Sequence, residues 1–207
     1  MLKIYNTLKG KKEIFKSIEE GKVGMYVCGN TVYDYCHIGH ARAMISFDII
    51  SRFIRHLGYE LTYVRNITDV DDKIIKRADE NNETTQALTE RMIAAQTEDE
   101  LRLGNKMPDR EPKATEFMQE IIDMIQVLID KGFAYQGTSG DVYYRTAAFK
   151  DYGKLNNRKL EDMLAGARID VEVAKEHPAD FVLWKQAKES EVSWSSPWGL
   201  GRPGWHI

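Results

Sequence analysis

Two histidines separated by two residues, the second preceded by a glycine, are the side chains in this sequence whose types and spacing best suit chemistry. The run His37-Ile38-Gly39-His40 follows a stretch of small and polar residues and precedes a segment with helical periodicity. A helix N-terminus offers free backbone N–H groups and the positive end of the helix dipole, which favour phosphate. Glycine lets a flat base approach the backbone. The pattern therefore predicts a nucleotide site in which imidazoles stabilise charge on phosphate oxygens.

The same four residues have a second interpretation, because a short motif match also fits two histidines that only cap a helix. A sulfur donor, Cys28, lies nine positions before His37. A free cysteine is commonly a core residue, and this interpretation applies to Cys28 taken alone and to Cys36. These are the only two cysteines, too few for a disulfide framework.

The elements that would position these residues alternate between strands and helices. Strands are predicted over 24–28 and 61–66, and helices over 41–57 and 73–81. The order strand, helix, strand, helix is typical of a parallel α/β sheet. In the first helix, the residues expected to face the core are Phe47, Ile50, Ile54 and Leu57.

The second half of the chain has a different character. A polar helix is predicted over 85–103, and we interpret the break at 107–112 as a boundary region. An amphipathic helix over 114–131 follows, and strands over 133–136 and 142–145 have the spacing of a hairpin. The apolar face of that helix contains Phe117, Ile121, Ile125 and Leu128.

Composition describes a globular chain without a membrane role. Of its 207 residues 43% are hydrophobic and 29% are charged, and no apolar run approaches the roughly 20 residues that cross a bilayer. The net charge of −3 gives no global reason to expect nucleic acid, so any RNA contact would be local. The N-terminus has no export signal, and a cytoplasmic location is the default expectation.

The motif and its flanks resemble the HIGH region of cysteinyl-tRNA synthetases over residues 24–42. Further matches follow in family order at 63–74, 180–185 and 198–207, so the resemblance covers essentially the whole chain. The motif residues are Asn30, Thr31, Val32, Tyr33, Asp34, Tyr35, Cys36, His37, Ile38, Gly39 and His40.

The resemblance implies an α/β fold. It would be the first half of a Rossmann-like parallel-sheet catalytic domain of the HIGH-type nucleotidyl transferases, with an inserted α+β connective subdomain. The implied boundaries are 1–113 for the first half, 114–198 for the connective insertion, and 199–207 for the start of the return to the catalytic domain.

The resemblance also implies roles for single residues. His37 and His40 would be catalytic and, with Gly39, would bind ATP, which enters with Mg²⁺. The position of Cys28 matches a ligand of one zinc ion whose open position takes the thiolate of the substrate cysteine, and zinc prefers thiolate to a hydroxyl. The residues implied at the amino-acid pocket are Gly29, Thr68 and Trp205, with Tyr26, Asn30 and Thr31 at its edge.

The implied activity is that of a ligase that makes cysteinyl-adenylate from cysteine and ATP and transfers the cysteine to tRNA(Cys). Family members of this kind are expected to be monomers. They continue past the position of Ile207 with a second cysteine ligand, a histidine and a glutamate ligand, and a KMSKS loop, and this chain has none of these. The stop at Ile207 looks cut, and we expect the chain alone to be inactive and to bind zinc weakly or not at all.

Two other interpretations stay open. The first is a cysteine ligase that delivers the amino acid to a small amino sugar; such enzymes tend to carry proline where this chain has Val32. The second is a naturally short, non-catalytic paralogue. The sequence downstream of Ile207 would separate this paralogue from a piece of the longer enzyme.

Overall fold

The computed structural model describes residues 2–155, 175–189 and 191–207, and the chain divides into two compact units. One unit is Ser17–Phe117, and the other combines Met1–Lys16 with Met118–Ile207. The boundaries expected from the resemblance stay a prediction. In the part of the chain that the structure describes, no helix is both long and apolar enough to span a membrane.

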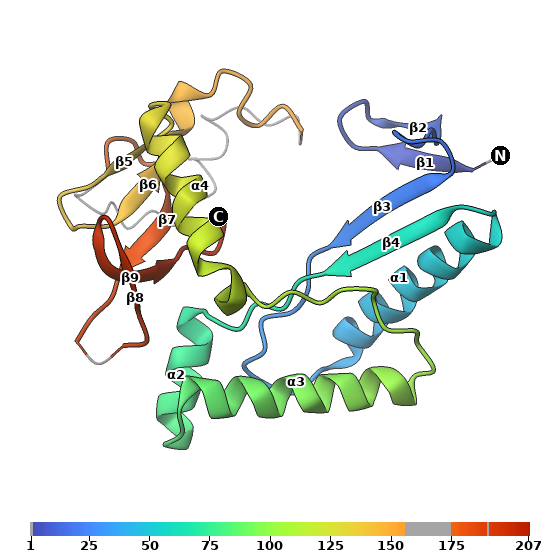
Figure 1. Ribbon diagram of the computed structural model, residues 1–207, viewed down its shortest axis with the longest axis horizontal. Helices are drawn as coiled ribbons and strands as arrows, with labels where there is room; N and C mark the ends of the chain where they lie inside the picture. Colours follow the sequence, from blue (N-terminus) through green and yellow to red (C-terminus); the bar gives the residue numbers. More distant parts are fainter. Residues whose placement is uncertain (1, 156–174, 190) are drawn as a thin grey trace. The chain divides into compact units, whose positions relative to one another are not determined.

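The first unit is built on two parallel strands connected by a helix (Figure 1). β3 (Lys22–Val27) pairs with β4 (Glu60–Arg65), and α1 (Ile38–His56) lies between them in the sequence and packs beside β4. The predicted order of strand, helix and parallel strand is confirmed. Parallel pairing requires such a crossover, because a tight turn can join only antiparallel strands.

The inner face of α1 is only partly the predicted one. Ile54 is buried, but Ile50 and Leu57 are 43% and 41% exposed, so their expected core position is wrong. Two polar residues, Asp48 and Ser51, are buried instead.

Asp48 tolerates its buried position because its carboxylate has partners. It accepts hydrogen bonds from Nε of Arg52 at 2.8 Å and from the backbone N–H of Lys106 at 3.1 Å. Burying a carboxylate is costly only when it lacks such partners. A hydrophobic pattern cannot indicate this kind of position in advance.

Two further helices, α2 (Asp72–Asn81) and α3 (Thr85–Arg102), pack on each other below the strands. Asp71 and Thr84 cap their N-termini through side-chain oxygens, as the polar residues before each apolar stretch favour. The helices share a buried cluster with the segments that precede them, and its members are Val32, Ile67, Ile74, Ala78, Leu88 and Met92.

The segment that follows α3 runs alongside β4. The N–H of Arg65 donates to the carbonyl of Arg110, and isolated parallel bridges join Val64 to Arg110 and Ile67 to Lys113. The break at 107–112 is therefore an irregular third strand at this edge of the sheet. A short 3₁₀ helix, η1 (Ala114–Phe117), ends the unit.

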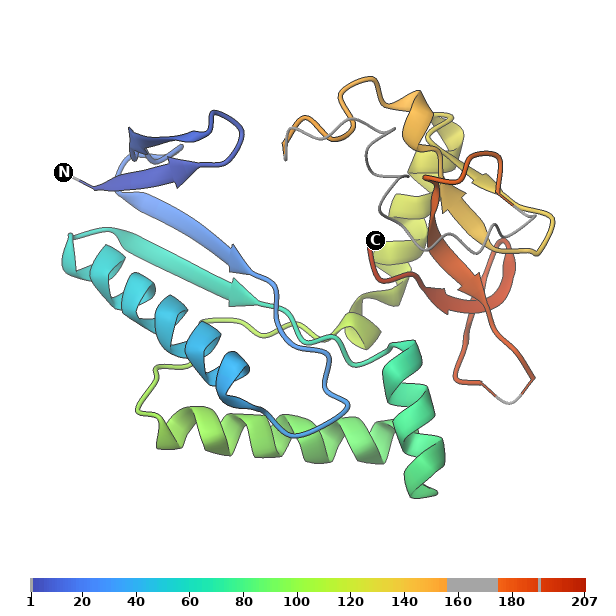
Figure 2. The same ribbon diagram turned by 180° about the vertical axis from the view of Figure 1, so that it is seen from behind.

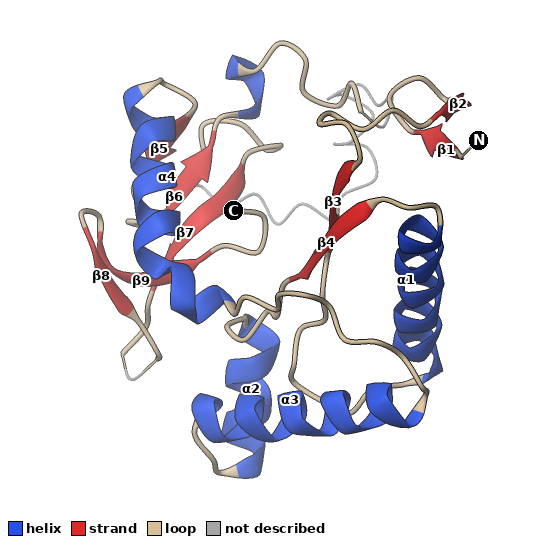
Figure 3. Cartoon of the chain, turned by 45° about the vertical axis from the view of Figure 1, so that its right-hand side comes forward, coloured by secondary structure: helices blue, strands red, loops and turns tan. Residues whose placement is uncertain are grey.

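The second unit contains α4 (Met118–Asp130) and a five-stranded antiparallel sheet (Figure 3). The predicted hairpin is confirmed, since β5 (Ala134–Gln136) pairs antiparallel with β6 (Val142–Tyr144). The helix begins at Met118 rather than at 114, and Phe117, expected on its inner face, is 43% exposed. A short 3₁₀ helix, η2 (Thr146–Ala148), follows β6.

The other three strands of this sheet are β7 (Phe181–Gln186), β8 (Trp194–Ser196) and β9 (Gly199–Pro203), and the spatial order is β5-β6-β7-β9-β8. The chain beyond 198 thus continues the sheet begun by β5 (Figure 2). A separate hairpin, β1 (Lys3–Asn6) with β2 (Lys11–Ile14), precedes β3.

Candidate functional site

The carboxyl ends of β3 and β4 bring two distant segments of the first unit together. Cys28 and Asn66 follow the last paired residues of the two strands, and the pairing resumes where Thr31 bridges Thr68. The N–H of Thr68 donates to the carbonyl of Asn30 at 3.2 Å. Ligands of open parallel sheets bind outside this edge, which makes it the candidate site.

Gly29 is the point of closest approach between these segments. Its backbone N–H donates to Oδ1 of Asn66 at 2.8 Å. A Cβ at Gly29 would overlap the backbone oxygen of Asn66, so no other residue fits without moving the chain. The glycine beside Cys28 therefore has a packing reason that is independent of any ligand.

Cys28 is exposed, and its neighbour on the same side of β3 is Tyr26. The hydroxyl of Tyr26 donates to Oδ1 of Asn66 at 3.0 Å and also contacts Cys28. Burial, and after it the adjacent Cys28 sulfur, raises the pKa of Tyr26. Tyr26 therefore remains a protonated donor at neutral pH, next to an accessible thiol.

The two imidazoles at the start of α1 cap the helix reciprocally. Nδ1 of His37 accepts from the N–H of Gly39 at 3.0 Å, and Nδ1 of His40 accepts from the N–H of His37 at 3.1 Å. The rings stack with their centroids 3.9 Å apart. This capping box explains why α1 begins at Ile38 instead of 41, the predicted start.

The caps also determine where each neutral ring carries its hydrogen. A backbone N–H can only donate, so each Nδ1 must be an acceptor and the hydrogen must lie on Nε2. Among the described residues no acceptor is seen for either Nε2–H, so both can donate to a ligand. Burial, and then repulsion from His37, lowers the pKa of His40, which favours its neutral form.

The loop that precedes α1 is held by a buried glutamine of α3. Nδ2 of Asn30 donates to Oε1 of Gln96 at 3.0 Å, and Sγ of Cys36 contacts the same oxygen at 3.7 Å. Burial, followed by the charges of Asp99 and Glu100, raises the pKa of Cys36. Cys36 therefore remains a thiol, and its contact with Gln96 helps to hold the loop in place.

The middle of the loop is anchored on α2. Val32 is 2% exposed and belongs to the buried cluster, while the ring of Tyr33 lies below the charged groups of Lys73 and Arg77. Arg77 also forms an ion pair with Asp34 at 3.0 Å. Tyr35 contacts Arg91 of α3.

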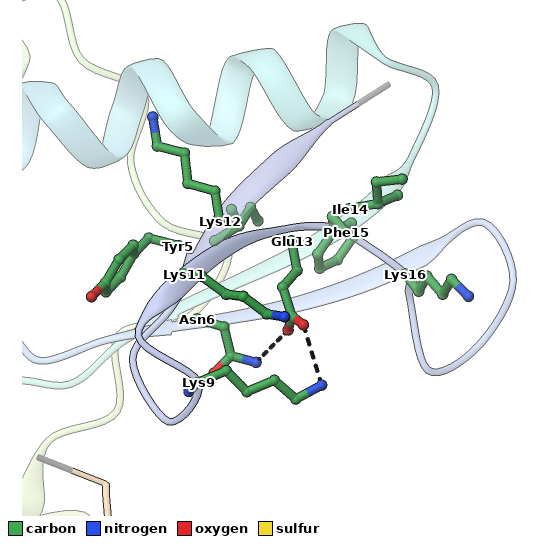
Figure 4. A pocket seen from close by; sticks show the side chains of 10 residues that line it. Tyr5, Asn6, Lys9, Lys11, Lys12, Glu13, Ile14, Phe15 and Lys16 are labelled. Atoms are coloured by element: carbon green, nitrogen blue, oxygen red, sulfur yellow. Dashed lines mark hydrogen bonds and ion pairs between the residues drawn. The ribbon is translucent and has the colours of Figure 1, made fainter. Parts of the chain in front are cut away.

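A pocket of about 290 Å³ opens beside the start of α1. Of the residues predicted to bind ATP, only His37 lines it, and neither Cys28 nor Thr68 does so. Its lining residues are Cys36, His37, Ile38, Ala41, Met44, Asp99, Arg102 and Leu103. A larger hollow of about 770 Å³ lies against the β1–β2 hairpin and contains none of the predicted site residues (Figure 4).

The structure thus forms two groups from the predicted residues of the first unit. Gly29 and Thr68 are hydrogen-bonded to Asn66, with Cys28 next to Gly29 in the chain, while His37, Gly39 and His40 form the helix cap. In the described part of the chain, no hydrogen bond, ion pair or ring contact joins one group to the other. Trp205 belongs to the other unit, where it is 71% exposed and lies against the ring of His206. The predicted roles of all these residues stay predictions.

Cys28 does not belong to a complete metal site within this chain. Over residues 2–155, 175–189 and 191–207, no group of three or more histidine, cysteine, aspartate or glutamate side chains is placed to hold an ion. Structural and catalytic zinc sites take three or four protein ligands. The described residues therefore do not by themselves fit zinc, and Cys28 would supply a single ligand.

Two polar residues that organise the site were missed. Asn66 connects three predicted pocket residues, and Gln96 holds both ends of the motif loop. The position of Asn66 directly after a strand of a parallel sheet was a usable signal. Gln96 gave none, because a glutamine in a polar helix normally faces solvent.

The fold is similar to that of Mycobacterium tuberculosis methionyl-tRNA synthetase, which was solved in complex with methionyl-adenylate. The TM-score is 0.56 at 15% identity, over 77% of this chain and 44% of that one. The likeness shows a shared mixed α/β fold, and the family model that matches this chain identifies that fold as a class I aminoacyl-tRNA synthetase catalytic domain.

The particular family follows from a closer match. The chain belongs to the family of class I (C) tRNA synthetase catalytic domains, whose model matches residues 14–207. The cysteine–tRNA ligases of Marinomonas sp. and Chromohalobacter salexigens are 92% and 64% identical to it. Each match takes in 100% of this chain and 45% of the relative, so the chain spans about half the length of these curated relatives. The resemblance stated from the motifs is confirmed.

Proposed function

We propose that this chain forms the first part of a cysteine–tRNA ligase, which activates cysteine with ATP to cysteinyl-adenylate and transfers the cysteine to tRNA(Cys). The observation that supports it best is the pair of imidazoles at the start of α1, whose caps use Nδ1 and leave each Nε2–H without a partner among the described residues. In the activation step, the carboxylate of cysteine attacks the α-phosphorus of ATP and pyrophosphate leaves. Charge grows on phosphate oxygens, and neutral N–H donors stabilise it.

In this proposal, His37 and His40 donate to the phosphates of ATP, and Gly39 leaves room for the nucleotide. The helix N-terminus adds its dipole to the same anion. Gly29, Thr68 and Trp205 line the amino-acid pocket, and Cys28 supplies one ligand of a zinc ion whose remaining ligands come from outside this chain. Mg²⁺ accompanies ATP.

The finer architecture is part of the same proposal. The strands β3 and β4 are the first half of a Rossmann-like sheet, and 114–198 is a connective insertion within it. The complete enzyme is a monomer that acts in the cytoplasm, where tRNA is charged. The parallel pairing of β3 and β4 supports the first half of such a sheet, and the separate antiparallel sheet supports a distinct subdomain after it, to which β9 also belongs.

A chimera tests the proposal directly. This chain replaces the matching 207 residues of the Marinomonas ligase, with which it shares 92% identity. We expect the chimera to catalyse cysteine-dependent ATP–pyrophosphate exchange and to charge tRNA(Cys), and we expect the isolated chain to do neither. A chimera that folds but shows no cysteine-dependent exchange contradicts the proposed activity. Exchange by the isolated chain contradicts the proposed incompleteness of its site.

A further inference from the structure

One amide side chain, that of Asn66, contacts three residues at the edge formed by β3 and β4. Its Oδ1 accepts from the backbone N–H of Gly29 at 2.8 Å and from the hydroxyl of Tyr26 at 3.0 Å. Its Nδ2 donates to Oγ1 of Thr68 at 3.2 Å. Tyr26 and Gly29 lie on either side of Cys28 in the chain. Asn66 therefore connects the segment around Cys28 with the segment that contains Thr68.

The orientation of this amide is determined by chemistry. The oxygen and nitrogen of an asparagine look alike in shape, but the N–H of Gly29 can only donate. The atom 2.8 Å from it must therefore be the amide oxygen, which leaves the NH₂ group facing Thr68. A flipped amide would place two donors against each other at Gly29.

The fixed amide in turn sets the role of the Thr68 hydroxyl. Oγ1 of Thr68 accepts from Asn66, so its own hydrogen points elsewhere. Among the described residues, no acceptor is recorded for that hydrogen. The hydroxyl is thus prepared to donate to an acceptor on a bound ligand, and the carboxylate is the acceptor that an amino acid brings.

We propose that Asn66 is a positioning residue of the amino-acid pocket: its amide, oriented by the N–H of Gly29 and the hydroxyl of Tyr26, makes Thr68 a hydrogen-bond donor to the substrate. The inference rests on the proposed function, because it takes the ligand at this edge to be an amino acid. Asn66 itself need not touch the substrate. Its contribution is the geometry of Thr68 and of the backbone beside Cys28.

The test uses the chimera described above, with the single variants Asn66→Ala, Asn66→Asp and Thr68→Val and the double variant that combines Asn66→Ala with Thr68→Val. For Asn66→Ala we expect the KM for cysteine in pyrophosphate exchange to rise about tenfold, as the loss of a partly buried hydrogen-bond partner would cause. The KM for ATP should stay within about twofold. Thr68→Val should raise the KM for cysteine in the wild-type background and change it little in Asn66→Ala, because both changes remove the same donor.

Asn66→Asp separates the effect of residue 66 on the Gly29 backbone from its effect on the Thr68 hydroxyl. A carboxylate still accepts from Gly29 and Tyr26, but it also accepts from the Thr68 hydroxyl and so withdraws that hydrogen from the ligand. On the 207-residue chain, amide hydrogen exchange at Gly29 should therefore stay slow in Asn66→Asp and become faster in Asn66→Ala. The KM for cysteine should stay raised in both. Asn81→Ala, which removes only an exposed bond to Glu83, is the matched control and should change neither quantity.

Each outcome bears on a different claim. An active chimera whose KM for cysteine is unchanged in Asn66→Ala overturns the inference and leaves the proposed function intact. Equal rises in the KM for cysteine and ATP, or effects of Asn66→Ala and Thr68→Val that multiply, overturn it in the same way. A folded chimera without cysteine-dependent exchange overturns the proposed function, and with it the substrate role of Thr68.

Discussion

His37 performs two tasks that substitution can separate, the capping of α1 and the supply of a free Nε2–H. Asparagine is a good N-cap, so His37→Asn should leave the thermal stability of the chain nearly unchanged, while His37→Ala should cost about 1 kcal/mol. In the chimera, both variants should lower kcat for pyrophosphate exchange by about 100-fold, the scale for one lost donor to developing charge. An unimpaired His37→Asn enzyme would reduce His37 to a helix cap.

His40 gives the chain a pH dependence whose sign follows from its burial. The folded state lowers the pKa of His40 below the unfolded value of about 6.5, so the unfolded chain binds more protons between the two values. Stability should therefore fall as pH drops below about 6.5 and stop changing below the folded pKa. Glutamine at this position preserves a capping box, so His40→Gln should weaken this dependence.

Urea unfolding at pH 8 and at pH 5.5 measures this difference. The wild-type chain should lose more of its free energy of unfolding between these conditions than His40→Gln loses. Comparing the two chains removes the contribution of every other titrating group. An equal loss of unfolding free energy in the wild-type chain and in His40→Gln would show that the titration of His40 does not contribute to the pH dependence.

At the scale of elements, a buried charge network joins β4, α3 and the segment after α3. Arg65 binds Glu100 at 2.6 Å and Glu111 at 2.6 Å, and the side chains of Arg65 and Glu100 are 6% and 2% exposed. Burial alone lowers the pKa of Arg65, but its hydrogen bonds to the two carboxylates outweigh this and raise the pKa above its ordinary value. The cost of burying these charges is therefore offset by the hydrogen bonds between Arg65 and its two carboxylate partners.

Removing Arg65 alone should lower the free energy of unfolding more than removing Arg65 and Glu100 together. Arg65→Met leaves Glu100 buried without its cation and should cost about 3–5 kcal/mol of unfolding free energy, while Arg65→Met with Glu100→Leu should recover part of that loss. The exposed pair of Arg102 and Glu98 on the same helix is the control, and Arg102→Met should cost less than about 1 kcal/mol. Urea titrations followed by circular dichroism supply all four values. A double variant less stable than Arg65→Met would contradict the argument.

At the scale of the whole molecule, α1 presents exposed apolar side chains in a row along the helix. Ile45, Ile49 and Phe53 are 37%, 60% and 48% exposed and follow one another at intervals of four residues. A contiguous apolar stripe of this kind favours association. We expect the 207-residue chain to self-associate, and Ile49→Glu with Phe53→Glu to make it monomeric.

Sedimentation velocity over a dilution series checks this expectation. Met124 on α4 is 59% exposed but lies on a different element, so Met124→Glu is the matched control and should not change the association. A wild-type chain that sediments as a single monomeric species would contradict the role of α1. The chain's relatives are more than twice its length, and we expect residues beyond the matched part to cover this stripe in those proteins.

The parts that could be predicted from sequence are those with strong local signals. The strands around Val27 and Val64 and the helices after Asp71 and Thr84 carry clear periodicity and caps, and they were predicted within a few residues. The strands β7, β8 and β9 were not predicted. β7 pairs with the distant strand β6, while β8 and β9 form a local hairpin whose turn was not recognised in the sequence.

The candidate site divides in the same way. His37 and His40 stood out because their types and spacing are unusual, and Cys28 and Thr68 came only from a family resemblance. Asn66 was missed because its importance comes from three contacts, each with a residue of ordinary type. Its place directly after a strand could have indicated the site, but the three contacts themselves are seen only when the segments are placed beside each other.

The parallel pairing of β3 with β4 has a consequence for the order in which the chain assembles. Gly29 and Asn66 meet across 37 positions, whereas the partners Gln136 and Val142 of the β5–β6 hairpin are close neighbours in sequence. Closing the longer loop costs more entropy before any contact compensates for it, so the hairpin should form early and the β3–β4 edge late. A molecule that binds at this edge can therefore recognise only a chain that has finished folding.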